Sequence, residues 1–376
     1  MTGKFFKTSF GHAIPVADGY RAQMPPPRDN ASPMGASSIT QSGGVKGPKE
    51  NPFGIMSDIF QYAFFADWLA TTPIAGRKFE CMLDIGGCTG LMSQLFKASG
   101  MVREAHNIEI LDYSDALDHD LVRHTIGKIR TGHQELTGQS AFDARLWKLR
   151  AGAKSRQVWL LNQLRFLEST FPYPITEHSH LWKLSPNLPL GLDRDIIGDF
   201  FELKEPYDFL LCVTTMQHFS VEAFLHKAKE IMAPGGVLLV WNAYWYWALL
   251  VNRLYGDFPW GAQRLTWDDY ERYLAEYQPD QIENARKSVN MFHKAELRYT
   301  VNDYLAAAEK VGLKHLAHHR LMPSAGLPAK IGAWTLKGDH GPSVQQEVLR
   351  DIHCFRPDVE AKDLVTQSVF LLFQKD

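Results

Sequence analysis

Residues 82–90 read Met-Leu-Asp-Ile-Gly-Gly-Cys-Thr-Gly, an apolar segment that runs directly into a glycine-rich turn. The residues that follow, 91–98 (LMSQLFKA), place apolar side chains at helical spacing. A strand, a tight turn and a helix N-terminus in this order form the unit that holds nucleotides in α/β folds. Glycine suits such a turn because it tolerates positive φ and, without a Cβ atom, lets a ligand approach the backbone. The sequence therefore predicts a nucleotide-type ligand at residues 86–90.

The residues around the turn distinguish two classes of nucleotide-binding protein. Dinucleotide dehydrogenases carry G-x-G-x-x-G after an apolar residue. Here an acid, Asp84, precedes the turn, and the glycines are Gly86, Gly87 and Gly90. This pattern resembles motif I of the class I S-adenosylmethionine (SAM) methyltransferases, D/E-x-G-x-G-x-G, with Cys88 in place of the middle glycine. The resemblance implies that Asp84 lies near the methionine end of SAM and that the glycine loop passes under its sulfonium.

A second acid follows the next expected strand, which lies near residues 106–111. Asp112 stands about 20 residues past the glycines, where nucleotide-binding folds place a carboxylate that accepts hydrogen bonds from ribose hydroxyls. We therefore expect Asp112 to bind the ribose. Glu109, three residues earlier, is the alternative.

Residues 196–201 (IIGDFF) resemble the "GD-F" segment of the same family, in which the acid accepts a hydrogen bond from the adenine amino group. The resemblance implies that Asp199 and Phe200 belong to the cofactor site. An ordinary loop carboxylate at a strand end is the alternative interpretation of Asp199.

The strand expected over 207–213 leads into Thr-Thr-Met-Gln-His-Phe-Ser, which resembles the family's fourth strand and the segment after it. The resemblance implies Thr214 at the cofactor and His218 on the acceptor side. Because imidazole titrates near neutral pH, His218 is the candidate general base; the alternative is that it only orders the loop. The remaining matches, in the family's order, are a helix over 221–233, a strand over 237–240 and a helix over 299–312.

The resemblance covers residues 80–120 and 195–320 and implies an α/β fold. The expected sheet is the Rossmann-like sheet of class I methyltransferases, mostly parallel with an antiparallel last strand, and it carries helical insertions. The predicted organisation is a flexible N-terminal arm over 1–52, a SAM-binding domain over 53–376, and insertions at 115–190, 243–295 and 322–362 that form a cap.

Aromatic residues crowd the start of the second insertion. They include Trp241, Tyr244, Trp245 and Trp247. Such residues line pockets for small-molecule acceptors, but they also pack into cores with their polar atoms satisfied, or lie at a membrane surface. The sparse Lys and Arg of this segment disfavour a membrane surface, so a substrate pocket and a core remain as hypotheses.

Composition narrows the functional classes. The net charge of −2 provides no basic field for nucleic acid. The four cysteines make no CxxC pair and the histidines lack the spacing of a helical metal pair, so the sequence predicts no metal, no disulfide framework and a reducing, cytoplasmic location. No apolar signal segment follows the first lysines, and the longest apolar run is shorter than the ~18 residues of a membrane span.

The resemblance and the site residues together predict a SAM-dependent methyltransferase. The expected partner is a small or medium-sized acceptor, and the expected target is an oxygen of a sugar, phenol or carboxylate, because His218 would then act as the base. The alternatives are N- or C-methylation and a catalytically silent SAM-binding regulatory protein. An NAD-dependent oxidoreductase is disfavoured by the glycine spacing. A homodimer stays open.

Overall fold

A seven-stranded sheet runs through the part of the chain that the computed structural model describes. Its strand order is β5-β4-β3-β6-β7-β9-β8, and all neighbours are parallel except at β9, which is antiparallel to both β7 and β8. The strands are β3 (Phe79–Ile85), β4 (Val102–Glu109), β5 (Arg194–Ile197), β6 (Tyr207–Val213), β7 (Met232–Ala243), β8 (Lys314–Leu321) and β9 (Ser368–Gln374). The described residues are 5–15, 52–113, 117–137, 178–243, 261–283, 285–286, 298–321, 341–366 and 368–376.

This strand order confirms the expected Rossmann-like sheet with an antiparallel last strand. The chain moves outward from β3 through β4 to β5 and then returns to β6 on the other side of β3. Between β3 and β6 the order therefore reverses. In open α/β sheets a ligand binds at such a switch point, beyond the carboxyl ends of the strands.

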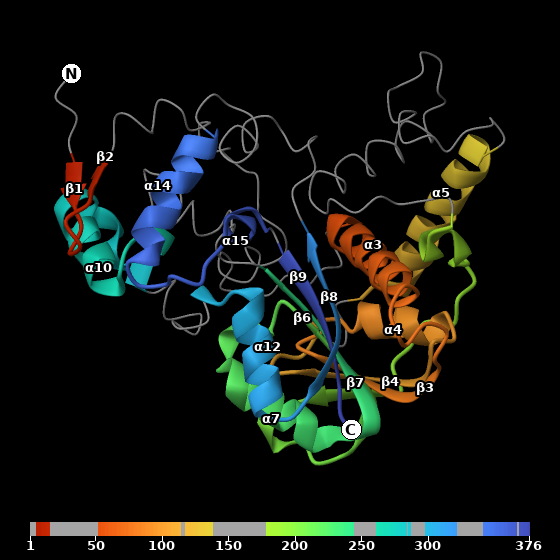
Figure 1. The fold of residues 1–376 in the computed structure, drawn as a ribbon. Coiled ribbons are helices and arrows are strands. Elements are labelled where there is room, and N and C mark those ends of the chain that lie inside the picture. The colour runs from red at the N-terminus through yellow and green to blue at the C-terminus, as the bar shows by residue number, and fades with distance from the viewer. Residues whose placement is uncertain are drawn as a thin grey trace.

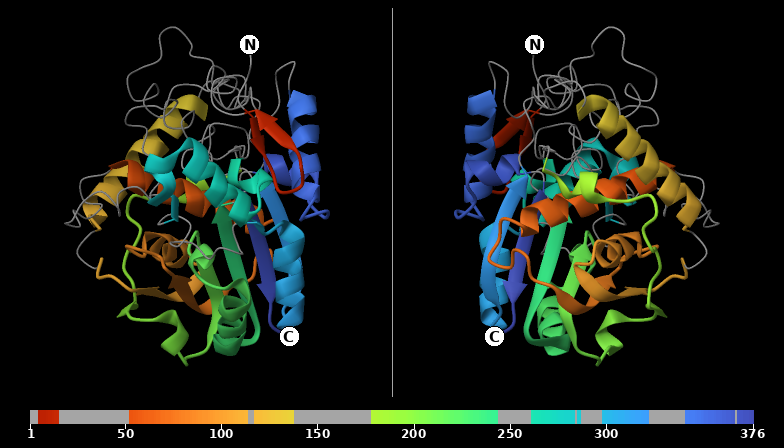
Figure 2. Two further views of the ribbon diagram at one scale, coloured as in Figure 1. Left: turned by 90° about the vertical axis from the view of Figure 1, so that its left-hand side faces the viewer. Right: turned by 90° about the vertical axis from the view of Figure 1, so that its right-hand side faces the viewer.

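Helices cover both faces of the sheet (Figure 1; Figure 2). The central strands are continuous apolar runs because both of their faces are buried. Along β6, for example, Leu211 packs into one layer and Leu210 into the other. One layer holds α3 (Pro52–Leu69), α4 (Leu91–Ala98) and α5 (His119–Thr137), and the other holds α7 (Val221–Ile231), α12 (Val301–Lys310), α14 (Gly341–His353) and α15 (Ala361–Val365).

The elements that frame the expected ligand site have nearly the predicted bounds. The helix over 91–98 and the strand over 207–213 are confirmed to the residue. The second strand differs, because β4 ends at Glu109 and leaves Asp112 beyond it. Helix α7 ends before the Pro-Gly-Gly turn, since Met232 already pairs with Tyr207 in the sheet.

Part of the segment expected to be a flexible arm is an ordered hairpin, β1 (Phe5–Lys7) and β2 (Ala13–Pro15). It packs on α10 (Trp267–Tyr277), where the buried Phe6 ring meets Tyr273 edge-on at 5.5 Å. The Ser9 amide and hydroxyl both donate to Asp269, at 2.9 and 2.8 Å. Residues 5–15 of the expected arm are therefore ordered and docked on α10, and residues 16–51 lie outside the described residues.

The second and third insertions meet at a buried ion pair. Arg264, in the short helix α9 (Gly261–Arg264), donates through Nε and Nη2 to Asp351 of α14 at 3.0 and 2.8 Å. His12 of the hairpin lies 2.8 Å from the same carboxylate. These elements form a lobe beside the sheet (Figure 1). By contrast α5, from the first insertion, packs against α3 in the opposite layer.

Among the helices that the structure describes, none combines the length and the apolarity needed to cross a membrane.

Candidate functional site

The loop between β3 and α4 accepts only glycine at two positions. A Cβ atom at Gly86, where φ is +71°, would lie 2.4 Å from Oγ1 of Thr215. At Gly87 a Cβ atom would lie 2.5 Å from the carboxyl carbon of Asp84 and from Oδ1 of Asn107. The loop therefore packs without side chains against the ends of β3, β4 and β6, as a nucleotide-binding turn must.

In the described part of the chain, two non-glycine residues have positive φ. Cys88 lies within this loop, and Thr214 directly follows β6. Cys88 has φ +51° and Thr214 has φ +54°. Hydrogen bonds hold both: Asn107 Nδ2 donates to the Cys88 carbonyl at 3.0 Å, and the Thr214 amide donates to the Trp241 carbonyl at 2.8 Å. Backbone strain of this kind concentrates at functional sites, and here it marks the ends of β3 and β6.

Asp84 is a buried carboxylate beneath the loop, with 1% of its surface exposed. Among the described residues neither carboxylate oxygen accepts a hydrogen bond of ordinary geometry; the nearby Ser93, which partly stabilises the charge, donates its hydroxyl to the Gly90 carbonyl at 2.9 Å. Burial, together with the charges of Asp58 and Glu109, raises the pKa of Asp84 to about 7. An ionised carboxylate in this place is costly unless a cation or a hydrogen-bond donor reaches it.

Asp58 brings a further acid to the loop, and its neighbours along the chain offer little reason to select it. It lies half-buried on α3, and burial raises its pKa to about 7. Its charge acts on both Asp84 and Cys88. The helix, PFGIMSDIFQYAFFADWL, carries two carboxylates, Asp58 and Asp67, and its sequence does not distinguish the one that acts on the loop. Asp58, Asp84 and Glu109 together make the loop a setting for a cationic ligand.

Glu109, rather than Asp112, stands at the carboxyl end of β4. Its carbonyl accepts from the Gly198 amide at 3.0 Å, which holds the ends of β4 and β5 together. Asp112 is exposed and lies past the strand. Large apolar side chains next to Glu109 are also exposed, namely Ile110 (73%), Leu111 (45%) and Ile197 (59%). Ribose hydroxyls need a hydrogen-bond acceptor and an adenine ring needs an apolar surface. An acid beside an exposed apolar surface offers both.

The Gly-Asp-Phe-Phe segment has a structural role in its first residues. Asp199 is exposed and accepts from the Phe201 amide at 2.9 Å, which caps the 3₁₀ turn η4 (Phe200–Glu202). Phe200 is buried and packs on Phe224, with ring centres 5.3 Å apart. Phe200 therefore lies in the core, whereas we expected it at the cofactor.

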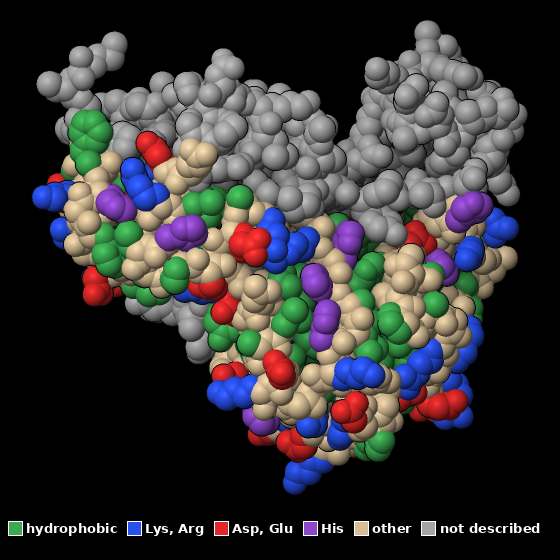
Figure 3. Space-filling view, in the orientation of Figure 1, with side chains coloured by type: hydrophobic (Ala, Val, Ile, Leu, Met, Phe, Trp, Pro, Cys, Tyr) green, Lys and Arg blue, Asp and Glu red, His purple; other side chains and the backbone are tan. Residues whose placement is uncertain are grey.

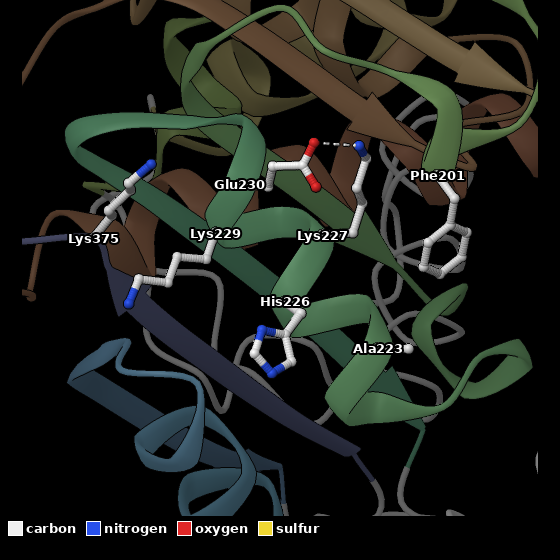
Figure 4. Close-up of a pocket in the computed structure, with 7 residues that line it drawn as sticks. All are labelled: Phe201, Ala223, His226, Lys227, Lys229, Glu230 and Lys375. Atoms are coloured by element: carbon white, nitrogen blue, oxygen red, sulfur yellow. Dashed lines mark hydrogen bonds and ion pairs between the residues drawn. The ribbon is translucent and has the colours of Figure 1, made fainter.

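Phe201 turns toward α7 and lines a surface pocket of about 650 Å³ (Figure 4). The lysines of this pocket already have partners: Lys227 pairs with Glu230 at 2.9 Å, Lys229 donates to the Val311 carbonyl at 2.9 Å, and Lys375 donates to the Met232 carbonyl at 2.6 Å. The pocket lies on α7, and we do not assign it to the loop site. Its lining residues are Phe201, Ala223, His226, Lys227, Lys229, Glu230 and Lys375.

The expected acceptor side is described in part. His218 is exposed at the end of the 3₁₀ turn η5 (Met216–His218), where its amide donates to the Thr215 carbonyl at 3.0 Å. Trp241 is buried, stacks on Phe370 at 6.0 Å and meets Phe65 edge-on. Of the two hypotheses for the aromatic cluster, the core therefore describes Trp241. The other aromatic candidates, Tyr244, Trp245 and Trp247, lie outside the described residues.

Cys88 is expected to react slowly with alkylating agents, although its side chain reaches solvent. The surrounding protein and the charges of Glu109, Asp58 and Asp84 raise the pKa of its thiol to about 12. The reactive thiolate is therefore scarce at neutral pH. At pH 8 iodoacetamide should modify Cys88 at least tenfold more slowly than the exposed Cys354, as followed by peptide mass spectrometry. Equal rates of modification at Cys88 and Cys354 would contradict the raised pKa of the Cys88 thiol.

The strand order of the sheet and the position of the glycine loop at the switch point indicate the same fold. The chain has the class I methyltransferase fold. No family model matches it, and no curated protein matches it in sequence.

Solved structures of related shape include the cyclopropane synthase MmaA2 from Mycobacterium tuberculosis, with 11% identity and a TM-score of 0.36 over 84% of each chain. The plantazolicin methyltransferase BpumL, solved with S-adenosylhomocysteine (SAH), has 11% identity and a TM-score of 0.35 over 87% of this chain and 86% of its own. The [4+2]-cyclase SpnF has 11% identity and a TM-score of 0.35 over 83% and 80%. Likeness at this level assigns no function, so we base the function on the site.

Proposed function

We propose that the chain binds SAM at residues 86–90 and transfers the methyl group to a small or medium-sized acceptor. The observation that supports this most is the buried carboxylate of Asp84, which lies beneath the glycine loop and accepts no hydrogen bond of ordinary geometry from the described residues. SAM carries a sulfonium and an ammonium group, and both are cations. A cation at this loop would offset the cost of the ionised carboxylates of Asp84 and Asp58.

The residues present fit the separate parts of SAM. Asp84 would accept from nitrogen donors of the methionine part, and Gly86 and Gly87 would let the ligand approach the backbone. Glu109 would accept from the ribose hydroxyls, with Asp112 as the alternative. Adenine would lie on the exposed apolar surface made by Ile110, Leu111 and Ile197, with Asp199 in reach of the amino group as a further proposal.

SAM, when bound, supplies an electrophilic methyl group on its sulfonium. The protein has to orient the acceptor, exclude water and, for an oxygen acceptor, remove a proton. We propose His218 for the last task, because it is exposed at the carboxyl end of β6 and Thr215, which packs on Gly86, connects it to the loop. An oxygen acceptor such as a sugar, phenol or carboxylic acid follows from a base at this position.

The base proposal predicts that His218→Ala leaves the SAM affinity unchanged and lowers turnover by ~10²–10⁴-fold. His218→Gln, which keeps a hydrogen-bonding side chain but titrates no proton near neutral pH, should lose as much. Methyl transfer from radiolabelled SAM to a panel of phenols, sugars and carboxylic acids measures both variants. A loss of less than tenfold would assign His218 to ordering the loop.

The same panel, extended to amines and activated carbon acids, separates the alternatives. Label on nitrogen or carbon alone would favour N- or C-methylation. Bound SAM without transfer would favour a catalytically silent SAM-binding regulator, and the strained Cys88 in place of a glycine is the feature consistent with that function.

The four cysteines are free, in keeping with the reducing cytoplasm as the proposed location.

A further inference from the structure

Side chains that commonly bind metal ions lie together near the middle of β3 and β4. Cys81 of β3 pairs in register with Glu104 of β4, and His106 follows on the same face of β4. The ligand atoms of these three residues lie within 4.8 Å of one another, and all three side chains are half-buried. The glycine loop follows the carboxyl ends of these strands (Figure 1). Sheet pairing creates this cluster, so the spacing along the chain could not reveal it.

The donor set of the cluster suits zinc. Thiolate, imidazole and carboxylate are its usual ligands, and tetrahedral sites with three protein ligands hold a water in the fourth position. Cys81 Sγ lies 3.9 Å from each ring nitrogen of His106. Two such atoms on one zinc ion would lie roughly 3.5 Å apart, given bonds of about 2.3 Å to sulfur and about 2.0 Å to nitrogen. The observed separation is therefore close to that of two ligands on one ion, and a rotation of the imidazole would direct one ring nitrogen to the ion.

A second ring of contacts orients the imidazole. Nδ1 of His106 lies 3.4 Å from the hydroxyl of Tyr207, which donates to Glu205 Oε2 at 3.3 Å. Burial raises the pKa of Tyr207, so its hydroxyl keeps the proton and its oxygen accepts from Nδ1–H. Burial and the charge of Arg194 lower the pKa of His106, which keeps the ring neutral. Nε2 is then the nitrogen with a lone pair for a metal ion.

Carboxylates fix the backbone on either side of the cluster. Asp208 accepts from the Cys81 amide at 2.8 Å, and Asp193 accepts from the Ala105 amide at 2.8 Å. Arg103 donates to Oε1 of Glu104 at 3.0 Å, which leaves Oε2 to face an ion. Burial and the charges of Glu104, Asp208 and Asp193 raise the pKa of Cys81 to about 11, against the opposing charge of Arg103. The thiol is therefore protonated in the metal-free protein.

We propose that Cys81, Glu104 and His106 bind one zinc ion, with water as the fourth ligand. On binding, the Cys81 S–H bond breaks, sulfur bonds to zinc and one proton passes to solvent. The ion would link β3 to β4 before the carboxyl ends of the strands, where the glycine loop begins, so its role is structural or regulatory. This site is independent of the proposed methyl transfer.

Cobalt titration of the full-length metal-free protein tests the proposal. Cobalt(II) replaces zinc in thiolate sites and produces a thiolate-to-cobalt charge-transfer absorption in the near ultraviolet. One equivalent of cobalt should saturate this absorption in the wild type, and one equivalent of zinc should remove it. Cys81→Ser should abolish the absorption and lower the zinc affinity at least tenfold. Cys354→Ser, which removes an exposed thiol elsewhere, should change neither.

The absorption also separates this site from other metal-binding groups. His315 and His318 on β8 have ring nitrogens 3.2 Å apart, and histidine side chains gather over that strand (Figure 3). They hold no thiolate, so they would bind cobalt without the absorption. As a second variant, His106→Gln should lower the zinc affinity while its circular dichroism matches the wild type. Absence of the absorption in the wild type, or its persistence in Cys81→Ser, overturns the proposal.

Discussion

Replacing Asp84 with asparagine is expected to abolish SAM binding and, at pH 8, to stabilise the ligand-free protein. The pKa of Asp84 is about 7 in the folded chain against 3.8 for the ordinary carboxyl group. Between these two values the folded state holds the proton that the unfolded state has lost, so the free energy of unfolding falls as pH rises from about 4 to about 7. Above that range the ionised carboxylate costs the folded state on the order of 4 kcal/mol.

Asparagine keeps the shape of the side chain but carries no charge, so it removes this cost together with the acceptor for a cation. Urea unfolding at pH 8 should show Asp84→Asn more stable than the wild type, with a much smaller difference at pH 5. Calorimetry should show at least a 100-fold loss of SAM affinity. Asp199→Asn makes the same chemical change at an exposed carboxylate near the same strand ends and controls for the substitution itself in the unfolding experiment. A variant that still binds SAM, or that is destabilised equally at both pH values, would contradict the role of Asp84.

Replacing Glu109 with glutamine is expected to weaken SAM binding by roughly 10–100-fold, whereas Asp112→Asn should change it by less than about twofold. A 10–100-fold loss of affinity corresponds to about 1.5–3 kcal/mol, which is the cost expected when hydroxyl donors lose a charged acceptor. The two substitutions are chemically matched and differ in place: Glu109 ends β4 beside the Gly198 amide, and Asp112 is exposed past the strand. Calorimetric titration of both variants with SAM measures the difference. A larger loss of SAM affinity in Asp112→Asn than in Glu109→Gln would assign ribose binding to Asp112 instead.

Patterns that are local in the chain predicted most of the sheet. The glycine loop, the helix over 91–98 and the strand over 207–213 each depend on a few neighbouring residues, and the structure confirms them. The order of the resembling motifs also predicted the antiparallel last strand, which the structure has at β9. Local spacing is sufficient here because turn chemistry and apolar periodicity determine each element on its own.

Contacts between distant elements account for what the sequence could not predict. Asp58 reaches the loop only because α3 packs beside α4, and nothing near Asp58 in the sequence signals this. Trp241 becomes a core residue because Phe65 from α3 and Phe370 from β9 enclose it. The end of β4 depends on its pairing with β5, which stops at Glu109 and Ile197. Strand register and helix packing set these positions, and the local spacing of residues along the chain predicts neither.

Calorimetric titration of the wild-type protein with SAM, SAH and NAD tests the central claim most directly. We predict micromolar binding of SAM and SAH at one site per chain, no binding of NAD, and loss of SAM binding in Asp84→Asn. Binding of NAD without SAM, or SAM binding that Asp84→Asn leaves unchanged, would contradict a SAM site at the glycine loop.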